Sequence, residues 1–190
     1  MKVLFIQKIR VAFSLASIFL VVLGGIAWWS ASRSISAFRN VDQTHQVLDE
    51  LDDTAIGILN AETSVRTFAW SGEDTYLKPY QSGLTTLEHT REELQQLTRN
   101  NKQMQTKLTT LEALLDKKLA SLAATIQERR ANGSEAASKL LGSREGDALM
   151  EQIRNVIAEM QVIERRLLDK RSSKAQAEAH STISSANRDR

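Results

Sequence analysis

The hydrophobic residues of this chain form one long uninterrupted block, and after it they recur with the periodicity of a helix. No charged residue occurs from Val11 to Ser32, and nearly every side chain as far as Trp29 is apolar. As a helix rising about 1.5 Å per residue, this block would extend about 33 Å, enough to cross a hydrocarbon core of about 30 Å. We therefore expect a transmembrane helix over residues 11–32.

The flanks of this block indicate its orientation. Basic residues stand before it, from Lys2 to Arg10, and the pair Trp28-Trp29 closes it. Because basic residues stay inside and tryptophans favour the interface, residues 1–10 are expected in the cytoplasm and the rest of the chain outside it. A cleaved signal peptide usually has a shorter apolar core of about 7–15 residues, and a buried soluble helix would need other apolar segments to cover it. We favour an uncleaved anchor.

Beyond Arg33, apolar residues recur at alternating spacings of three and four, as they do along the seams of packed helices. The pattern predicts four helices. Their seam positions, in chain order, are Leu48, Leu51, Ala55, Ile58, Glu62 and Val65; Leu84, Leu87, Leu94 and Leu97; Leu108, Leu111, Leu115, Leu119, Leu122 and Ile126; and Leu149, Ile153, Val156, Met160, Ile163 and Leu167.

Turn residues separate the four helices. The first helix should end near Gly72, which adopts the left-handed conformation of a helix cap easily. The second should begin near Leu77 or Lys78, because Pro79 is tolerated only in a first turn. Further turns are expected at residues 99–101 and 131–133, and a short helical turn at residues 135–141. The ends of the elements are thus set by a few glycine, proline and asparagine residues.

The predicted lengths and turns define the fold class. The first and fourth helices have about 40 residues each, whereas the second and third have about 22–28. Short turns favour antiparallel neighbours. We therefore expect an all-α protein in which an N-terminal transmembrane helix is followed by an up-down-up-down four-helix bundle over residues 33–171, with long first and fourth helices. Residues 172–190 are expected to form a helical juxtamembrane linker.

Composition and charge exclude several functions. The chain has no cysteine and a formal net charge of +2, so disulfides and thiolate metal sites are excluded and nucleic acid is not an expected partner. The histidines, at positions 45, 89 and 180, lack metal-ligand spacing. Since no phosphate loop or nucleophile elbow occurs either, we expect no enzyme, no cofactor and no metal.

Glu62 is the one charged residue in the first apolar seam. A buried carboxylate is costly unless it is paired or hydrogen-bonded. Relative height along the bundle favours Arg154 as its partner, with Arg66 or Arg129 next. We interpret Glu62 as a polar contact that sets helix register, in preference to a direct ligand contact.

Four aromatic residues stand around the first distal turn: Phe68, Trp70, Tyr76 and Tyr80. The favoured interpretation is a small cap core that holds this loop. The alternative is an aromatic ligand pocket, because apolar concavities with a few charges are typical of small-molecule sites.

The run from Asn60 to Tyr80, NAETSVRTFAWSGEDTYLKPY, resembles the signature of the type-three CHASE domain. The resemblance includes Pro79, which stands immediately before Tyr80 at the end of the run. The family usually has Asp, Gly and Thr where this chain has Asn60, Thr67 and Ser71. Further similarity includes the Arg129-Arg130 pair, and the resemblance covers residues 41–171.

The resemblance implies an extracellular sensory four-helix bundle of a bacterial receptor, followed by a second transmembrane helix and a cytoplasmic output domain. We expect this chain to be such an input domain in the bacterial inner membrane, with its bundle in the periplasm or outside the cell. It should pair as a homodimer through its first and fourth helices and pass signals by relative helix motion. A membrane-anchored structural or adaptor coiled coil without ligand is the alternative. Whether a small molecule or a protein is the ligand is left open.

Overall fold

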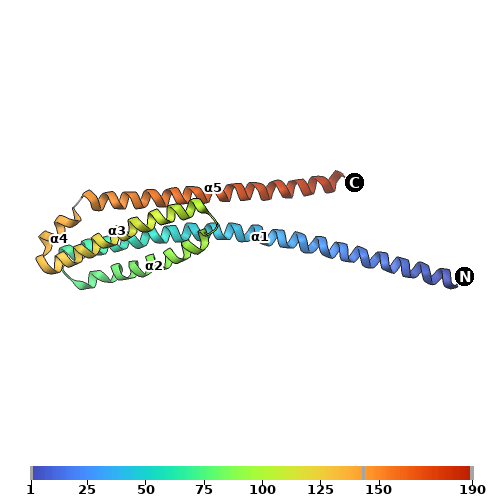
Figure 1. Cartoon of the computed structure of the whole chain (residues 1–190), viewed down its shortest axis with the longest axis horizontal. Coiled ribbons are helices and arrows are strands. Elements are labelled where there is room, and N and C mark those ends of the chain that lie inside the picture. The colour runs from blue at the N-terminus through green and yellow to red at the C-terminus, as the bar shows by residue number, and fades with distance from the viewer. Residues whose placement is uncertain (1, 143, 189–190) are drawn as a thin grey trace. The chain divides into compact units, whose positions relative to one another are not determined.

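The computed structural model describes the backbone of residues 2–142 and 144–188, and side chains at residues 20–22, 24–25, 28, 42–142, 144–170 and 172–173. This part of the chain is helical (Figure 1). The elements are α1 (Lys2–Ser71), the 3-10 helix η1 (Asp74–Leu77), α2 (Lys78–Thr98), α3 (Lys102–Asn132), α4 (Ser134–Leu141) and α5 (Arg144–Arg188).

The chain divides into two compact units, residues 1–42 and 43–190. The first is the N-terminal part of α1, and the apolar side chains described in it, such as Leu20 and Trp28, are exposed. Among the residues described, no helix combines the length and the apolar character needed to cross a membrane. Most side chains of the expected anchor, residues 11–32, lie outside the described residues, as do those of the expected cytoplasmic segment 1–10 and most of the linker 172–190.

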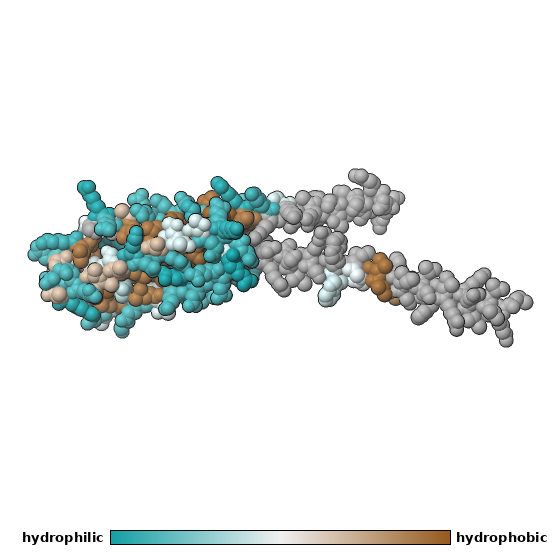
Figure 2. All heavy atoms as spheres, in the orientation of Figure 1, coloured by the Kyte–Doolittle hydropathy of each residue, from teal (hydrophilic) through white to brown (hydrophobic). Residues whose placement is uncertain are grey.

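The second unit is an all-α helical bundle, which confirms the predicted fold class at that level. Its successive long helices α1, α2, α3 and α5 run in alternating directions (Figure 1). α3 packs against α2, α4 and α5, and one apolar cluster draws residues from α1, η1, α2, α3 and α5. The bundle surface seen in Figure 2 is mostly hydrophilic, with apolar patches between the polar side chains.

The turn residues end the helices where the sequence predicts. Gly72 has a φ of 76°, and its amide donates to the carbonyl of Phe68 at 2.8 Å after the last residue of α1. Gly133, with a φ of 85°, follows α3 in the same way. Asn101 caps α3, because its side chain accepts a hydrogen bond from the amide of Met104 at 3.2 Å. These three helix ends therefore have a local chemical cause.

The buried face of α1 is wider than the predicted seam. Leu51, Ile58, Glu62 and Val65 are buried as expected, whereas Leu48 and Ala55 are only partly buried. A second buried row runs beside the first and carries mainly small or polar side chains. Its members are Thr44, Thr54, Gly57, Ala61 and Ser64, together with the apolar Val47 and Phe68. The periodicity of large apolar residues did not predict this row, because most of its members are not large apolar residues.

The small residues of this row bring α1 and α2 close together. A Cβ atom added to Gly83 of α2 would lie only 2.8 Å from the carbonyl oxygen of Gly57 in α1. The hydroxyl groups of Thr54 and Thr90 hydrogen-bond across the same interface at 3.0 Å. Near the turn, the Ser64 hydroxyl donates to the carbonyl of Tyr76 and accepts from the amide of Tyr80 at 3.1 Å. This interface is therefore held by backbone contact and neutral hydrogen bonds.

Candidate functional site

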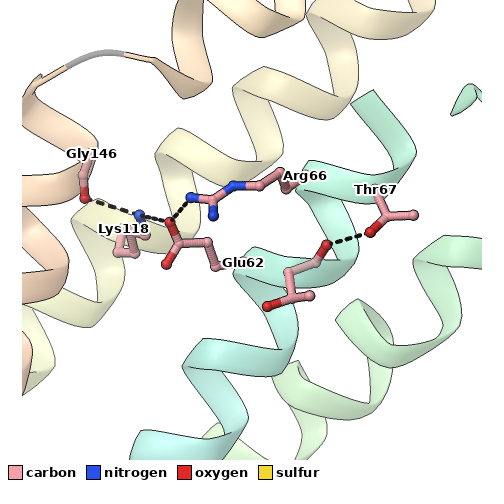
Figure 3. Close-up of polar contacts among 6 residues, drawn as sticks. Glu62, Arg66, Thr67, Lys118 and Gly146 are labelled. Carbon is pink, nitrogen blue, oxygen red and sulfur yellow. Dashed lines mark hydrogen bonds and ion pairs between the residues drawn. The ribbon is translucent and has the colours of Figure 1, made fainter. Parts of the chain in front are cut away.

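Glu62 is buried in the bundle, with 7% of its surface exposed, and carries an ion pair on each side (Figure 3). Its Oε1 atom lies 3.0 Å from Nη2 of Arg66, one turn along α1, and 3.2 Å from Nζ of Lys118 in α3. The two cations offset the cost of burying the carboxylate. The prediction that Glu62 has an ionic partner is confirmed.

Lys118 is the more deeply buried of the two cations, at 3% exposed, whereas 55% of the Arg66 side chain is exposed. The Lys118 ammonium also donates to the carbonyl oxygen of Gly146 in α5 at 3.0 Å (Figure 3). A single side chain of α3 thus contacts α1 and the first turns of α5. Because Lys118 is desolvated and Arg66 is largely in water, Lys118 contributes most of the stabilisation of this carboxylate.

The preferred partner of Glu62, Arg154, was predicted wrongly. Arg154 is exposed on α5 and makes no ion pair within the described part of the chain. Height along the bundle put Arg154 near Glu62, but height does not fix the direction in which each helix turns its side chains. Lys118 was overlooked although it continues the spacing of Leu111, Leu115 and Leu122, a signal that would have identified it as buried.

A cavity of about 530 Å³ opens between α1 and α5 beside this ion-pair network. α1 contributes Leu59, Glu62, Thr63 and Arg66 to its lining. α5 contributes Asp147, Met150, Glu151 and Arg154. The structure therefore brings three predicted residues, Glu62, Arg66 and Arg154, to one site without joining them all directly.

The aromatic residues at the distal turn do not form the expected shared cap core. Phe68 is buried and Tyr80 packs partly against the apolar cluster, where burial raises the pKa of its phenol. Trp70 and Tyr76 instead point outward, and Trp70 is 77% exposed. The cap-core prediction is therefore correct for Phe68 and Tyr80 and wrong for the other two.

Arg129 and Arg130 close the same end of the bundle from α3. The Arg130 guanidinium lies over the Phe68 ring, 5.7 Å from its centroid, and pairs with Asp74 at 2.8 Å. Arg129 is packed beneath Gly72, so close that a Cβ atom at position 72 would collide with its guanidinium. Pro79 stands exposed in the first turn of α2, as the sequence predicts. Arg129 thus supports the turn and does not pair with Glu62.

Comparison with known proteins identifies the family of this chain. Residues 37–174 match the CHASE3 domain family. The chain belongs to this family. The CHASE3 resemblance found in the run from Asn60 to Tyr80 is thereby confirmed, and the chain is a sensor domain of a kind that is typically extracytoplasmic.

The CHASE3 bundle is also similar to a solved structure, the sensor domain of the histidine kinase HK9 from Rhodopseudomonas palustris. The TM-score is 0.62 at 23% sequence identity, and the match covers 66% of this chain and 98% of that chain. At this identity the similarity concerns the fold. A comparison with curated proteins gives no match.

Proposed function

We propose that this CHASE3 domain is the extracytoplasmic input part of a bacterial membrane receptor, and that it signals to a cytoplasmic output domain by relative motion of α1 and α5. The observation that carries this proposal is the cavity between these two helices, whose lining comes from α1 and α5 alone. A change in cavity occupancy would act directly on their separation. The family match supports the sensory role.

The direction of the two helices supports transmission. Gln161 of α5 donates to Asp52 of α1 at 2.7 Å, and farther along the bundle Met150 and Glu62 line the cavity together. α1 and α5 are therefore antiparallel. Gln43 and the later residues of α5 lie at one end of the bundle, so a shift of about 1–2 Å between the helices, typical of switching proteins, would be delivered at that end.

We further propose that residues 11–32 are the membrane anchor of this receptor. Its support is the uncharged apolar sequence with basic residues before it and tryptophans after it. In cells, the chain should remain in the membrane fraction after extraction with alkaline carbonate. Release into the soluble fraction would contradict the anchor.

The receptor is proposed to be a homodimer through α1 and α5. Both helices expose apolar side chains, including Ile56 on α1 and Val162 on α5. Sedimentation of the detergent-solubilised chain should give a dimer. The double variant Ile56→Asn/Val162→Asn should weaken this dimer. Leu140→Asn, at an exposed site on α4, is the control and should leave the dimer intact. A monomeric wild-type chain would remove this part of the proposal.

Relative helix motion can be tested with cross-links, because the natural chain has no cysteine. Asp52→Cys with Gln161→Cys places one thiol on α1 and one on α5 at a point of direct contact. In a fusion of the chain to a histidine-kinase output module, a short thiol cross-linker should lock this pair and abolish changes in autophosphorylation on stimulation.

The matched control joins two helices outside the proposed signal path. Arg91 and Asp116 pair at 2.5 Å between α2 and α3, so Arg91→Cys with Asp116→Cys accepts the same cross-linker. This cross-link should leave the response intact. A full response in the chain locked at 52 and 161 would refute transmission by motion of α1 against α5.

A further inference from the structure

The cavity between α1 and α5 contains four charges besides the buried Glu62–Lys118 pair. Two are positive, Arg66 on α1 and Arg154 on α5, and two are negative, Asp147 and Glu151 on α5. Because Glu62 and Lys118 offset one another, the remaining lining has no net charge. Such a lining matches a ligand that carries both signs.

The two carboxylates lie at a spacing that is unfavourable for like charges on a helix. Asp147 and Glu151 are four residues apart on one helix, a spacing at which like charges repel and destabilise the helix. Asp147 lies in the first turn of α5, where the helix dipole favours an acidic residue. Glu151 lies beyond that turn, so the dipole does not account for it. A cation held between the two carboxylates would relieve their repulsion.

The two arginines retain hydrogen-bond donors for an anion. Arg66 contacts Glu62 through Nη2, and a guanidinium has five N–H donors in total. Arg154 has no ion pair within the described part of the chain. Since Arg66 and Arg154 come from different helices, a carboxylate bound by both would connect α1 to α5.

We propose that this cavity binds a small zwitterion of the amino-acid class. The ligand carboxylate is held by Arg66 and Arg154, its ammonium group by Asp147 and Glu151, and its side chain by Leu59 and Met150. The volume of about 530 Å³ falls within the usual range for small-molecule sites, about 300–1,000 Å³. The proposal rests on the sensory function proposed above and specifies the class of ligand.

The first experiment measures binding of L-amino acids, one at a time, to the detergent-solubilised full chain by isothermal titration calorimetry. At least one should bind. Its amide, which lacks the carboxylate, and its N-acetyl derivative, which lacks the ammonium group, should each bind at least about tenfold more weakly, as expected when one charged contact is lost. Absence of binding by every amino acid, or equal binding by either derivative, would overturn the proposal.

The second experiment uses variants of exposed residues that leave the buried network intact. Arg154→Gln and Glu151→Gln should each weaken binding at least about tenfold without lowering Tm, because single charged contacts are removed from a solvated rim. Arg165→Gln and Asp169→Asn, exposed on the same helix and outside the cavity lining, are the controls and should bind normally. Unchanged binding in Arg154→Gln and Glu151→Gln would place the ligand elsewhere and overturn the proposal.

These measurements are independent of the test of helix motion. A chain that binds no amino acid but loses its response when locked at 52 and 161 remains a receptor with another class of stimulus. A chain that binds amino acids but responds when locked has the site and not the proposed transmission.

Discussion

α1 packs against α2 and α5 in two different ways. Against α2, its backbone comes within contact distance at Gly57 and Gly83, and the hydroxyls of Thr54 and Thr90 hydrogen-bond. Against α5, a charged cavity of about 530 Å³ separates part of the two helices. The first interface leaves no room for adjustment, whereas the second has a volume that a ligand or water can occupy.

This difference divides the bundle into a fixed part and an adjustable part. Closely packed interiors resist small displacements because every shift creates overlap or voids. The α1–α2 hairpin should therefore behave as one body. Part of the contact between α1 and α5 is formed by the exposed side chains around the cavity, and Lys118 is a buried connection between the two helices beside it. The following predictions test this division, from the largest expected effect to the smallest.

Lys118→Met should have the largest effect on stability. It leaves the Glu62 carboxylate buried with only the exposed Arg66 as a partner, and loss of one member of a buried pair costs about 3–5 kcal/mol. We expect a loss near 3 kcal/mol in the free energy of unfolding, measured by urea denaturation, because Arg66 retains part of the pairing.

Two further variants test whether that loss of stability comes from leaving the Glu62 charge unpaired. Lys117→Met, at the exposed neighbouring position, should change stability by less than about 0.5 kcal/mol. Adding Glu62→Gln to Lys118→Met removes the unpaired charge and should recover part of the loss. A double variant as unstable as the sum of both single variants would indicate that the two residues do not interact.

Gly83→Ala tests the fixed interface. The new methyl group would stand 2.8 Å from the carbonyl oxygen of Gly57, so the two backbones must separate. Overpacking of this kind costs about 1–3 kcal/mol, and the better helix propensity of alanine returns about 1 kcal/mol. We expect a net loss of up to about 2 kcal/mol in the free energy of unfolding, measured by thermal unfolding.

Gly57→Ala is the matched variant across the same interface. Its methyl group would meet the side chain of Leu87 at 3.3 Å, and a side chain can move where a backbone cannot. Gly57→Ala should therefore destabilise less than Gly83→Ala. The reverse order would show that backbone contact does not limit the approach of α1 and α2.

Glu50→Gln should have the smallest effect, and one that depends on pH. Burial raises the pKa of the Glu50 carboxyl, with Asp53, Glu93 and Asp49 adding to the rise and His89 opposing it. A folded-state pKa above the ordinary value of 4.5 means that ionisation of Glu50 disfavours the folded state. The stability that protonated Glu50 contributes is therefore fully present below pH 4.5 and is lost as pH rises through the folded pKa.

Glu50→Gln should accordingly raise Tm slightly at pH 7, and the difference from wild type should vanish below pH 4.5. Glu92→Gln, at an exposed site on α2, is the control and should match wild type throughout. A gain that persists at low pH would assign the effect to something other than the charge of Glu50.

The sequence predicted the helix ends well because local chemistry determines them. Gly72, Asn101 and Gly133 act within a few residues of their own positions, through left-handed backbone or side-chain capping. No knowledge of distant helices is needed. The family signature added the sensory role, because it combines many such local features in one run.

The sequence predicted the interior contacts less well, for two physical reasons. The contact between Gly57 and Gly83 depends on the absence of side chains, which a count of apolar residues does not register. The choice of Lys118 over Arg154 as partner of Glu62 depends on the rotation of α3 and α5 about their axes. Spacing along one helix gives its faces but not the neighbour that each face meets.

The packing of Gly72 against Arg129 has a consequence for how such domains vary. Position 72 combines a left-handed backbone with a collision between any Cβ and the Arg129 guanidinium, whereas a Cβ at Gly133 would meet no atom within 4 Å. Asparagine tolerates the left-handed backbone but still carries a Cβ. Asparagine at position 72 should therefore require the Arg129 guanidinium to move aside or a smaller side chain at position 129, so that position 72 varies together with position 129, whereas position 133 varies independently of both.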